Sequence, residues 1–419
     1  MKILAGVLTL LLSVTAFAGE GEINSGDTAW VLTSAALVLF MLPGLAMFYG
    51  GMVRTKNALN TMMLSFIAMA VIGIQWVLIG FSIAFGDSGS SVWGSFQYAL
   101  MGGSFASELS GTIPLSVFAM FQGMFAIITC ALISGAVVER MKFSAFIVFI
   151  AVWATIVYAP IAHWVWGAGG WLLERGALDF AGGTVVHFSS GTAALALAIV
   201  LGNRKDFMKS ATIPHNVGYT LIGAGILWFG WFGFNAGSAL SAGEGAGVAF
   251  VNTLAAPGAA GLGWLLMEAL KSKPSGIGLA SGIVAGLVAI TPAAGFVEPW
   301  AAIIIGFVAG ILCFYGCRLK FIFKLDESLD VFGIHGIGGF WGAIATGIFA
   351  TVGAEGLIKG NAYQVWLQFE GVMAAGIYSF VLSLVIAFII KFTIGIRASA
   401  EAETEGLDIS LHGEHVIKL

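Results

Sequence analysis

The sequence is dominated by long apolar runs, each long enough to cross a lipid bilayer as a helix. Eleven runs can be marked, at residues 28–51, 58–85, 113–137, 143–166, 179–201, 216–239, 248–270, 276–297, 299–317, 329–350 and 364–394. A span needs about 20 apolar residues, and only helices or closed barrels satisfy their backbone hydrogen bonds inside lipid. Barrel strands are shorter and alternate in polarity. The runs therefore predict an all-α polytopic membrane protein with eleven transmembrane helices.

The composition supports this class and excludes several others. Hydrophobic residues make up 59% of the 419 residues and charged residues only 10%, too few charges to cover a water-soluble surface. The 59 glycines are typical of closely packed membrane helices. The net charge of −4 argues against a nucleic-acid partner. Cys130, Cys313 and Cys317 lie in apolar runs without a CxxC pair, so we expect neither disulfides nor a zinc site.

The N-terminus and the distribution of basic residues predict the topology. Residues 1–18 have the features of a cleavable signal peptide, with Lys2 and a cleavage motif at Ala16-Phe17-Ala18; the alternative is an uncleaved first helix. With Gly19 outside, 15 of the 18 lysines and arginines fall inside and only Arg175 and Lys359 fall outside. We expect a bacterial inner-membrane protein with a transmembrane domain at 19–396 and a cytoplasmic tail at 397–419.

Ten of the eleven spans divide naturally into two halves of five. Because each half has an odd number of spans, the second half is inverted relative to the first, as in many transporters. Asp179 begins the fifth span and His187 follows eight residues later; Glu327 and His335 repeat this spacing at the tenth. A two-fold axis in the membrane plane would bring the histidines together near the middle of the bilayer. The eleventh helix is then an outer strap.

Ionisable groups inside spans are costly and mark functional sites. His187 and His335 are the main candidates, because neutral imidazoles in an apolar lumen can hydrogen-bond a small solute or relay a proton. The alternative is a structural bond between helices; a metal site is not expected from two histidines alone. Asp179 can cap its helix by accepting N–H bonds from Ala181 or Gly182, or attract a cation to the pore mouth.

Two aromatic stretches suggest ring faces along a narrow path. Phe121 and Phe125 lie one helical turn apart, and residues 231–238 mix rings with small and polar residues. Aromatic faces attract cations without a counter-charge. No Walker loop, HExxH, CxxC or GxGxxG motif occurs. We therefore expect transport down a gradient, with no enzymatic activity and no cofactor.

The sequence blocks that contain these histidines, acids and aromatic residues resemble the ammonium transporter family, the Amt proteins related to the Rhesus glycoproteins. DFAGGTVVHFSSG at 179–191 is similar to the family signature. The other similar blocks are GLAMFYGGMVRTKN at 44–57, FQGMFAIIT at 121–129, GAVVER at 135–140, AHWVWG at 162–167, GWFGFNAGS at 230–238, AITPAAG at 289–295 and DVFGIHGIGG at 330–339. The resemblance covers residues 25–415 and implies selective transport of ammonium or ammonia.

The resemblance also implies a role for each matching residue. His187 and His335 correspond to twin pore histidines, below a gate formed by Phe125 and Phe234. Trp166, Ser238 and Phe121 correspond to an outer vestibule that recruits NH4+. Asp179 corresponds to the acid that supports recruitment and deprotonation. Trp166 favours the ammonium transporter branch over the Rhesus branch.

The resemblance extends to the tail and to the partners. Glu405-Gly406-Leu407-Asp408 and His412-Gly413-Glu414 are similar to the segment with which bacterial members dock the signalling protein PII. It implies a homotrimer with one pore per subunit; the alternative for the tail is a disordered acidic end. Three other functions stay open: an ammonium sensor that transports little, an intramembrane enzyme using the histidines as bases, and a carbon dioxide channel of the Rhesus type.

Overall fold

The computed structural model describes residues 22–87, 89–210 and 213–416. Within them, ten helices are long and apolar enough to cross a membrane, and Gly276–Ile290 is a shorter apolar helix. Together they agree with the eleven predicted spans. The predicted signal peptide, residues 1–18, lies outside the described residues, so its existence and its cleavage stay predictions.

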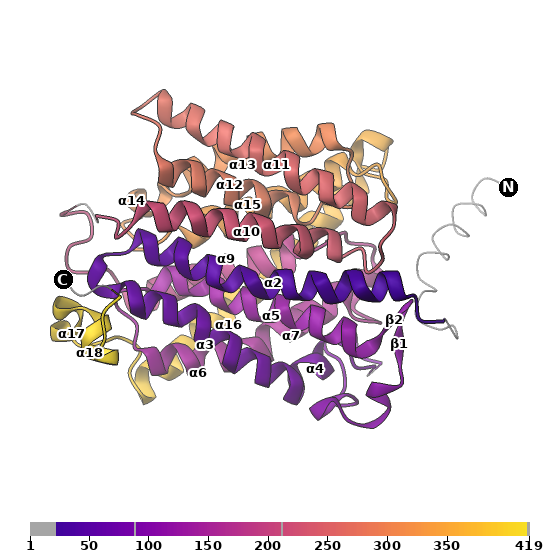
Figure 1. Ribbon diagram of the computed structural model, residues 1–419, viewed down its shortest axis with the longest axis horizontal. Coiled ribbons are helices and arrows are strands. Elements are labelled where there is room, and N and C mark those ends of the chain that lie inside the picture. Colours follow the sequence, from indigo (N-terminus) through magenta and orange to yellow (C-terminus); the bar gives the residue numbers. More distant parts are fainter. Residues whose placement is uncertain (1–21, 88, 211–212, 417–419) are drawn as a thin grey trace.

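The spanning helices lie side by side in one bundle (Figure 1). In chain order they are α2 (Ser25–Met52), α3 (Ala58–Gln75) with η2 (Trp76–Gly80) and α4 (Phe81–Phe85), α5 (Leu115–Val137), α6 (Phe143–Trp153) with η5 (Ala154–Tyr158), α7 (Ala159–Trp166) and α8 (Trp171–Glu174), η6 (Gly183–Phe188) with α9 (Ser189–Leu201), α10 (Val217–Gly237), α11 (Glu244–Ala269), α12 (Gly276–Ile290), α13 (Pro299–Gly316) with α14 (Leu319–Ile322), η7 (Phe332–Gly336) with α15 (Ile337–Phe349), and α16 (Tyr363–Thr393). The segments η2, η5, η6 and η7 are π-helical.

Two predicted spans have different ends in the structure. The run at 276–297 is helical only to Ile290, because Pro292 lacks the backbone N–H that would continue the helical hydrogen bonds. The run at 179–201 begins its helix at Gly183 rather than at Asp179, because the Asp179 carboxylate caps the backbone of the following residues. Both differences arise from local chemistry that hydropathy does not register.

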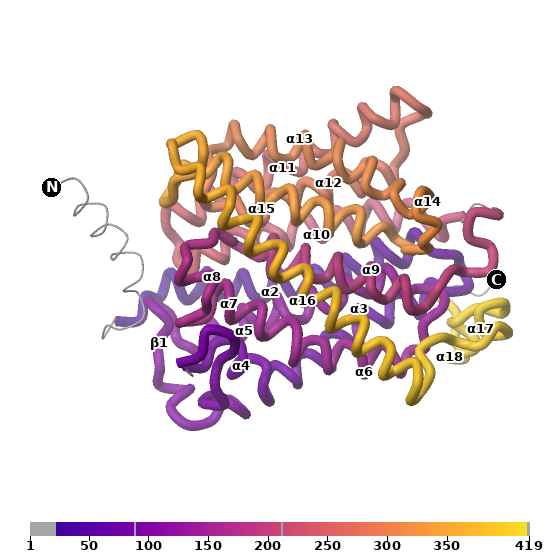
Figure 2. Tube along the Cα trace, turned by 180° about the vertical axis from the view of Figure 1, so that it is seen from behind, coloured from indigo at the N-terminus to yellow at the C-terminus, as the bar shows by residue number. Residues whose placement is uncertain are grey.

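The eleventh helix, α16, crosses the outside of the bundle at an angle (Figure 2). Its 31 residues correspond to a length of roughly 46 Å, which exceeds a hydrocarbon core of about 30 Å and favours a tilted helix. It packs mainly against α9, and its Ser379 hydroxyl donates to the carbonyl of Ser189 at 2.7 Å. This arrangement matches the predicted outer strap.

A short hairpin and the C-terminal tail lie at opposite ends of the bundle (Figure 1). The hairpin pairs β1 (Leu109–Ser110) with β2 (Ile113–Pro114). The tail forms α17 (Ala400–Glu405) and α18 (Leu407–His412). Asp408 accepts the backbone N–H groups of Leu59 and Asn60 at 3.0 and 2.8 Å, and so caps the start of α3. The tail is therefore ordered against the loop that precedes α3, and is not a disordered acidic end. We call this end of the bundle the tail side.

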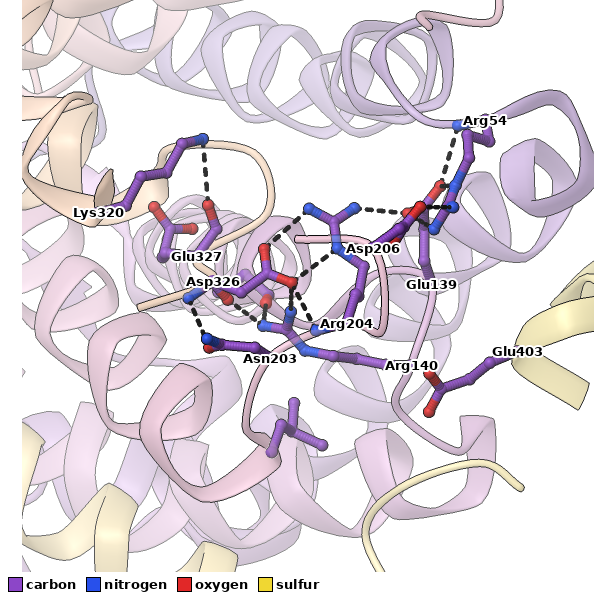
Figure 3. Close-up of polar contacts among 12 residues, drawn as sticks. Arg54, Glu139, Arg140, Asn203, Arg204, Asp206, Lys320, Asp326, Glu327 and Glu403 are labelled. Carbon is purple, nitrogen blue, oxygen red and sulfur yellow. Dashed lines mark hydrogen bonds and ion pairs between the residues drawn. The ribbon is translucent and has the colours of Figure 1, made fainter. Parts of the chain in front are cut away.

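A group of paired charges joins the tail-side loops (Figure 3). We call Arg54, Glu139, Arg140, Arg204, Asp206 and Asp326 the tail-side ion cluster. Glu139 contacts Arg54 at 2.6 Å and Arg204 at 2.5 Å. Asp326 contacts Arg140 and Arg204, both at 2.8 Å. Glu139, Arg140 and Asp326 are at most 1% exposed, so these ion pairs are shielded from solvent and hold loops from four parts of the chain together.

The Glu139 carboxylate predicts a loss of stability in acid. Burial alone would raise its pKa, but the hydrogen bonds and charges of Arg54 and Arg204 outweigh burial and lower the pKa from 4.5 to about 2. Because folding lowers this pKa, the stabilisation of the folded state by the Glu139 carboxylate is fully present above pH 4.5 and is lost as the pH falls towards 2. This stabilisation is about 3 kcal/mol. We expect Glu139→Gln to lower the thermal unfolding midpoint in detergent at pH 7, and to lower it by roughly half as much at pH 3.

The exposed Glu355 provides the control, because Glu355→Gln removes a carboxylate that solvent already screens. We expect this variant to have the same thermal unfolding midpoint as the wild-type protein at both pH values. A Glu139→Gln effect that is equal at pH 7 and pH 3 would contradict the prediction.

Candidate functional site

The two predicted histidines meet in the interior of the bundle. The Nδ1 atoms of His187 and His335 are 3.2 Å apart, and the ring centroids are 5.2 Å apart. The residues are 1% and 3% exposed. A hydrogen bond at this distance needs one Nδ1 to donate and the other to accept. In a neutral pair, one Nε2 is then an acceptor and the other carries a proton, so the pair offers a small solute both kinds of partner.

The chain brings the histidines together by crossing two discontinuous helices. His187 lies in η6 and His335 in η7; η6 packs on α15 while η7 packs on α9. The contact is very close: a Cβ at Gly191 would lie 2.4 Å from the backbone nitrogen of Gly336. Only glycine permits this crossing. The reciprocal packing fits the predicted inverted repeat, and π-helical turns of this kind are frequent at functional sites.

A stack of rings lies next to the histidines. Phe125 and Phe234 stack with centroids 4.1 Å apart and planes at 25°, and Phe234 stacks on His187 at 5.9 Å. Phe125 and Phe234 are 1% and 0% exposed. The two rings expected to form the gate are therefore buried, and Phe234 lies directly beside the imidazole pair.

The three predicted vestibule residues adjoin the other side of this stack. Phe121 meets the edge of Phe125 at 4.9 Å, and Trp166 meets it at 6.1 Å. Ser238 donates its hydroxyl proton to the Phe234 carbonyl at 2.8 Å, which leaves its oxygen lone pairs free to accept. Trp166 and Ser238 are partly exposed, whereas the rings beyond them are buried. Exposure of the side chains therefore decreases from these two residues to Phe125 and Phe234.

Asp179 holds the start of the helix that carries His187. Its Oδ1 accepts the N–H groups of Gly182 and Gly183 at 2.8 and 2.6 Å, and its Oδ2 accepts those of Thr184 and Val185 at 2.9 and 3.1 Å. The predicted cap is present, but it spans four residues and does not include Ala181. The Asp179 carbonyl also accepts the indole N–H of Trp166 at 2.8 Å.

The eight predicted residues thus form one continuous chain of contacts, and three of them, His187, His335 and Phe234, line an apolar cavity. The space open to the centre of a water-sized molecule is about 10 Å³, enough for about one such molecule. It is lined by Met41, Leu45, Phe48, Ile128, Leu132, His187, Leu227, Trp231, Phe234, Val284 and His335. His187 Nε2 is buried without a hydrogen-bond partner among the described residues. The histidines are the only ionisable groups of this lining.

Trp231 is a site residue that the sequence analysis did not assign. Its ring stacks on His187 at 5.3 Å, and its indole N–H donates to the Thr291 hydroxyl at 2.9 Å. The available signal was spacing, because Trp231 precedes Phe234 by three residues and so shares its helix face. Thr291 gave no comparable signal. Within the described ranges, no group of three His, Cys, Asp or Glu residues could hold a metal ion.

Comparison with known proteins decides the family. The model of the Ammonium Transporter Family matches residues 29–417. The chain belongs to the ammonium transporter family. An ammonium transporter of Bacillus subtilis is 52% identical over 398 residues, which are 93% of this chain and 98% of that protein.

Solved structures agree with this assignment. The crystal structure of Mep2 from Candida albicans matches this transporter with a TM-score of 0.85 and 35% identity, covering 91% of this chain and 88% of that one. A sensor Amt protein matches with a TM-score of 0.87 and 30% identity, covering 92% and 98%. The transporter is therefore a multi-pass membrane protein, and the expected family and fold class are confirmed.

Proposed function

We propose that this protein recruits NH4+ at an outer vestibule, removes one proton and conducts NH3 through an apolar pore past His187 and His335. The observation that carries the proposal is the bonded imidazole pair in a cavity that holds about one small molecule. Family membership supports ammonium as the substrate. The pore residues and their roles are part of the proposal.

Recruitment uses the partly exposed residues outside the ring stack. The hydrogen bond from the Trp166 indole fixes its ring, whose face can attract a cation. The Ser238 oxygen can accept an N–H bond from ammonium. Asp179 adds a negative charge close behind Trp166, although its oxygens are occupied by four backbone N–H groups. Asp179 therefore acts through its field and through the helix that it caps.

Passage beyond Phe125 and Phe234 favours the uncharged molecule. Moving an ion from water into such an interior costs several kcal/mol, and this cost falls on NH4+ and not on NH3. The proton released from NH4+ is taken up by water or by the imidazole pair, and the neutral molecule enters the cavity. There it can donate to one imidazole Nε2 and accept from the other.

The same barrier explains selectivity against potassium. K+ has about the size of NH4+ but has no proton to lose, so it keeps its charge and the full cost of dehydration. Selection therefore depends on acid–base chemistry rather than on pore diameter. If the imidazole pair also passes the released proton inward, each transport event carries one positive charge.

Current measurement on reconstituted protein tests the proposal. If the released proton follows NH3 inward, full-length protein in liposomes on a solid-supported membrane should give a current after a step in ammonium, and little or none after an equal step in potassium. Methylammonium uptake measures transport independently of charge. A sensor, the function suggested by the similar sensor Amt protein, would bind ammonium without sustained flux. Equal responses to ammonium and potassium would contradict the proposed pore.

The gate predicts a specific loss of selectivity. Phe234→Ala removes one ring of the 4.1 Å stack and enlarges the cavity, so water can enter. We expect the ratio of ammonium to potassium current to fall about tenfold, which corresponds to 1.4 kcal/mol of the barrier. Phe232→Ala is the matched control, because Phe232 lies on the same helix and stacks on the exposed Phe250 instead. An unchanged ratio in Phe234→Ala argues against the gate.

The same proposal includes the cellular setting of the transporter. A signal peptide at 1–18, a transmembrane domain at 19–396 and a regulatory tail at 397–419 place it in a bacterial inner membrane, with the C-terminus in the cytoplasm. It assembles as a homotrimer, and the tail docks a PII-type signalling protein. The ordered packing of α17 and α18 against the first tail-side loop supports a structured docking surface.

A further inference from the structure

Glu327 occupies the position before His335 that Asp179 occupies before His187. Each acid precedes its histidine by eight residues, and each is followed by a π-helical segment that carries that histidine. Both acids are buried, with exposures of 4% for Glu327 and 7% for Asp179. Glu327 adjoins the tail-side ion cluster (Figure 3), whereas Asp179 adjoins Trp166.

The contacts of Glu327 reach the helix of His335. Its Oε2 accepts the backbone N–H of Phe332, the first residue of η7, at 3.3 Å. Its Oε1 is buried with no hydrogen-bond partner among the described residues. Asp179, with four such bonds, holds its helix more tightly. Glu327 therefore faces the backbone N–H groups of Val331 and Phe332 at the start of the helix, with one long hydrogen bond to Phe332.

The backbone on both sides of Glu327 is fixed by charged neighbours. Asp326 is held by Arg140 and Arg204, and its N–H donates to the Asn203 side chain at 3.0 Å. On the other side, Lys320 Nζ lies 2.7 Å from Asp330 Oδ1 and donates to the Glu327 carbonyl at 3.3 Å. Figure 3 shows Glu327 between these two anchors. The carboxylate is thus presented to the helix from a rigid support.

The charges around Glu327 are unevenly balanced. Asp326 is compensated by two arginines, whereas no ion pair of the described residues includes the Glu327 side chain. Burial raises the pKa of Glu327, and the charge of Asp330 raises it further against the opposing charge of Lys320. Such an uncompensated buried acid is costly, which argues for a role beyond closing a loop.

We propose that Glu327 is a positioning residue for His335: its carboxylate orients the first turn of η7 and thereby fixes the orientation of the His335 ring, which faces His187. The proposal rests on the proposed twin-histidine pore and adds a residue to it. The pore then has two buried acids, Asp179 and Glu327, and each acid fixes the orientation of the imidazole on its own helix.

Three substitutions separate the possible roles. Glu327→Ala removes the acceptor, and we expect the maximal rate of methylammonium uptake to fall about tenfold with little change in KM. Glu327→Gln keeps an acceptor without charge, and we expect at least half of the rate to remain. Glu327→Asp reproduces the residue type found at Asp179, and we expect the same recovery.

The decisive measurement is the ¹⁵N spectrum of the histidines in lipid-reconstituted protein. Comparison with His335→Ala assigns the His335 signals, and we expect Glu327→Ala to shift or broaden them while Glu327→Gln leaves them close to wild type. Glu268→Ala is the matched control, because Glu268 accepts the Ser275 N–H at 2.8 Å near the start of α12, which carries no pore histidine. If Glu327→Ala does not fold, the Gln and Asp variants still carry the test.

The outcomes distinguish the two proposals. Wild-type uptake and wild-type His335 signals in Glu327→Ala would overturn the role of Glu327, while selective flux in the unaltered protein would leave the twin-histidine pore standing. Equal losses in the Ala, Gln and Asp variants would also overturn it, because positioning needs only an acceptor. Absence of ammonium-selective flux in the unaltered protein would refute the proposed function itself.

Discussion

Replacing Asp179 with alanine is expected to lower ammonium flux by about 100-fold or more, because four buried N–H groups lose their acceptor. An unsatisfied buried donor costs about 1–3 kcal/mol. The sum is comparable with the stability of a whole domain, so the turn that carries His187 cannot keep its geometry. Current per unit of purified protein, compared with the amount of assembled protein on size exclusion, measures the effect.

Asp179→Asn separates the cap from the charge of the acid. The amide keeps one acceptor for two N–H groups but presents an NH2 group to the other two, so donors face donors. We expect this variant to transport nearly as poorly as the alanine variant. Glu174→Ala is the control, since it removes an exposed carboxylate only five residues earlier. Wild-type flux in Asp179→Ala would show that the cap is dispensable.

Replacing both His187 and His335 with alanine is expected to lower the ratio of ammonium to potassium current at least about tenfold. The two substitutions remove the only ionisable groups of the cavity and enlarge it, so the lumen either loses its solute contacts or fills with water. In the first case ammonium uptake disappears, and in the second potassium also passes. Currents and methylammonium uptake, measured on the same liposomes, identify which of the two occurs.

A second pair of histidines provides the control for this variant. His215 lies in a tail-side loop and His415 is exposed near the C-terminus, so their joint replacement changes the same residue types away from the pore. We expect wild-type flux and selectivity from that control. Unchanged flux and selectivity in His187→Ala with His335→Ala would refute the assignment of the pore.

Membrane spans limit where polar residues can occur, and this made the two histidines recognisable in the sequence. Their matched distances from two acids predicted that the imidazoles meet, and the structure places their Nδ1 atoms 3.2 Å apart. Spacing singled out the stretches that contain Phe125 and Phe234, and the resemblance to the family paired the two rings as a gate. Hydropathy located the spans because lipid requires about 20 apolar residues whatever the neighbouring helices are.

Features that depend on tertiary contacts were not predictable in this way. The tail-side ion cluster joins residues separated by more than 100 positions, such as Arg204 and Asp326, and its pairs follow no local pattern. The position of Trp231 against His187 depends on how α10 meets η6. The end of α12 at Ile290 could have been expected from Pro292, since proline has no backbone N–H with which to continue a helix.

The small size of the pore cavity has a bioenergetic consequence. A lumen with room for about one molecule cannot hold an unbroken file of water, along which hydrogen ions would hop freely from one face of the bilayer to the other. Water alone therefore gives hydrogen ions no continuous path through this cavity, and any hydrogen ion that crosses it has to use the imidazole pair.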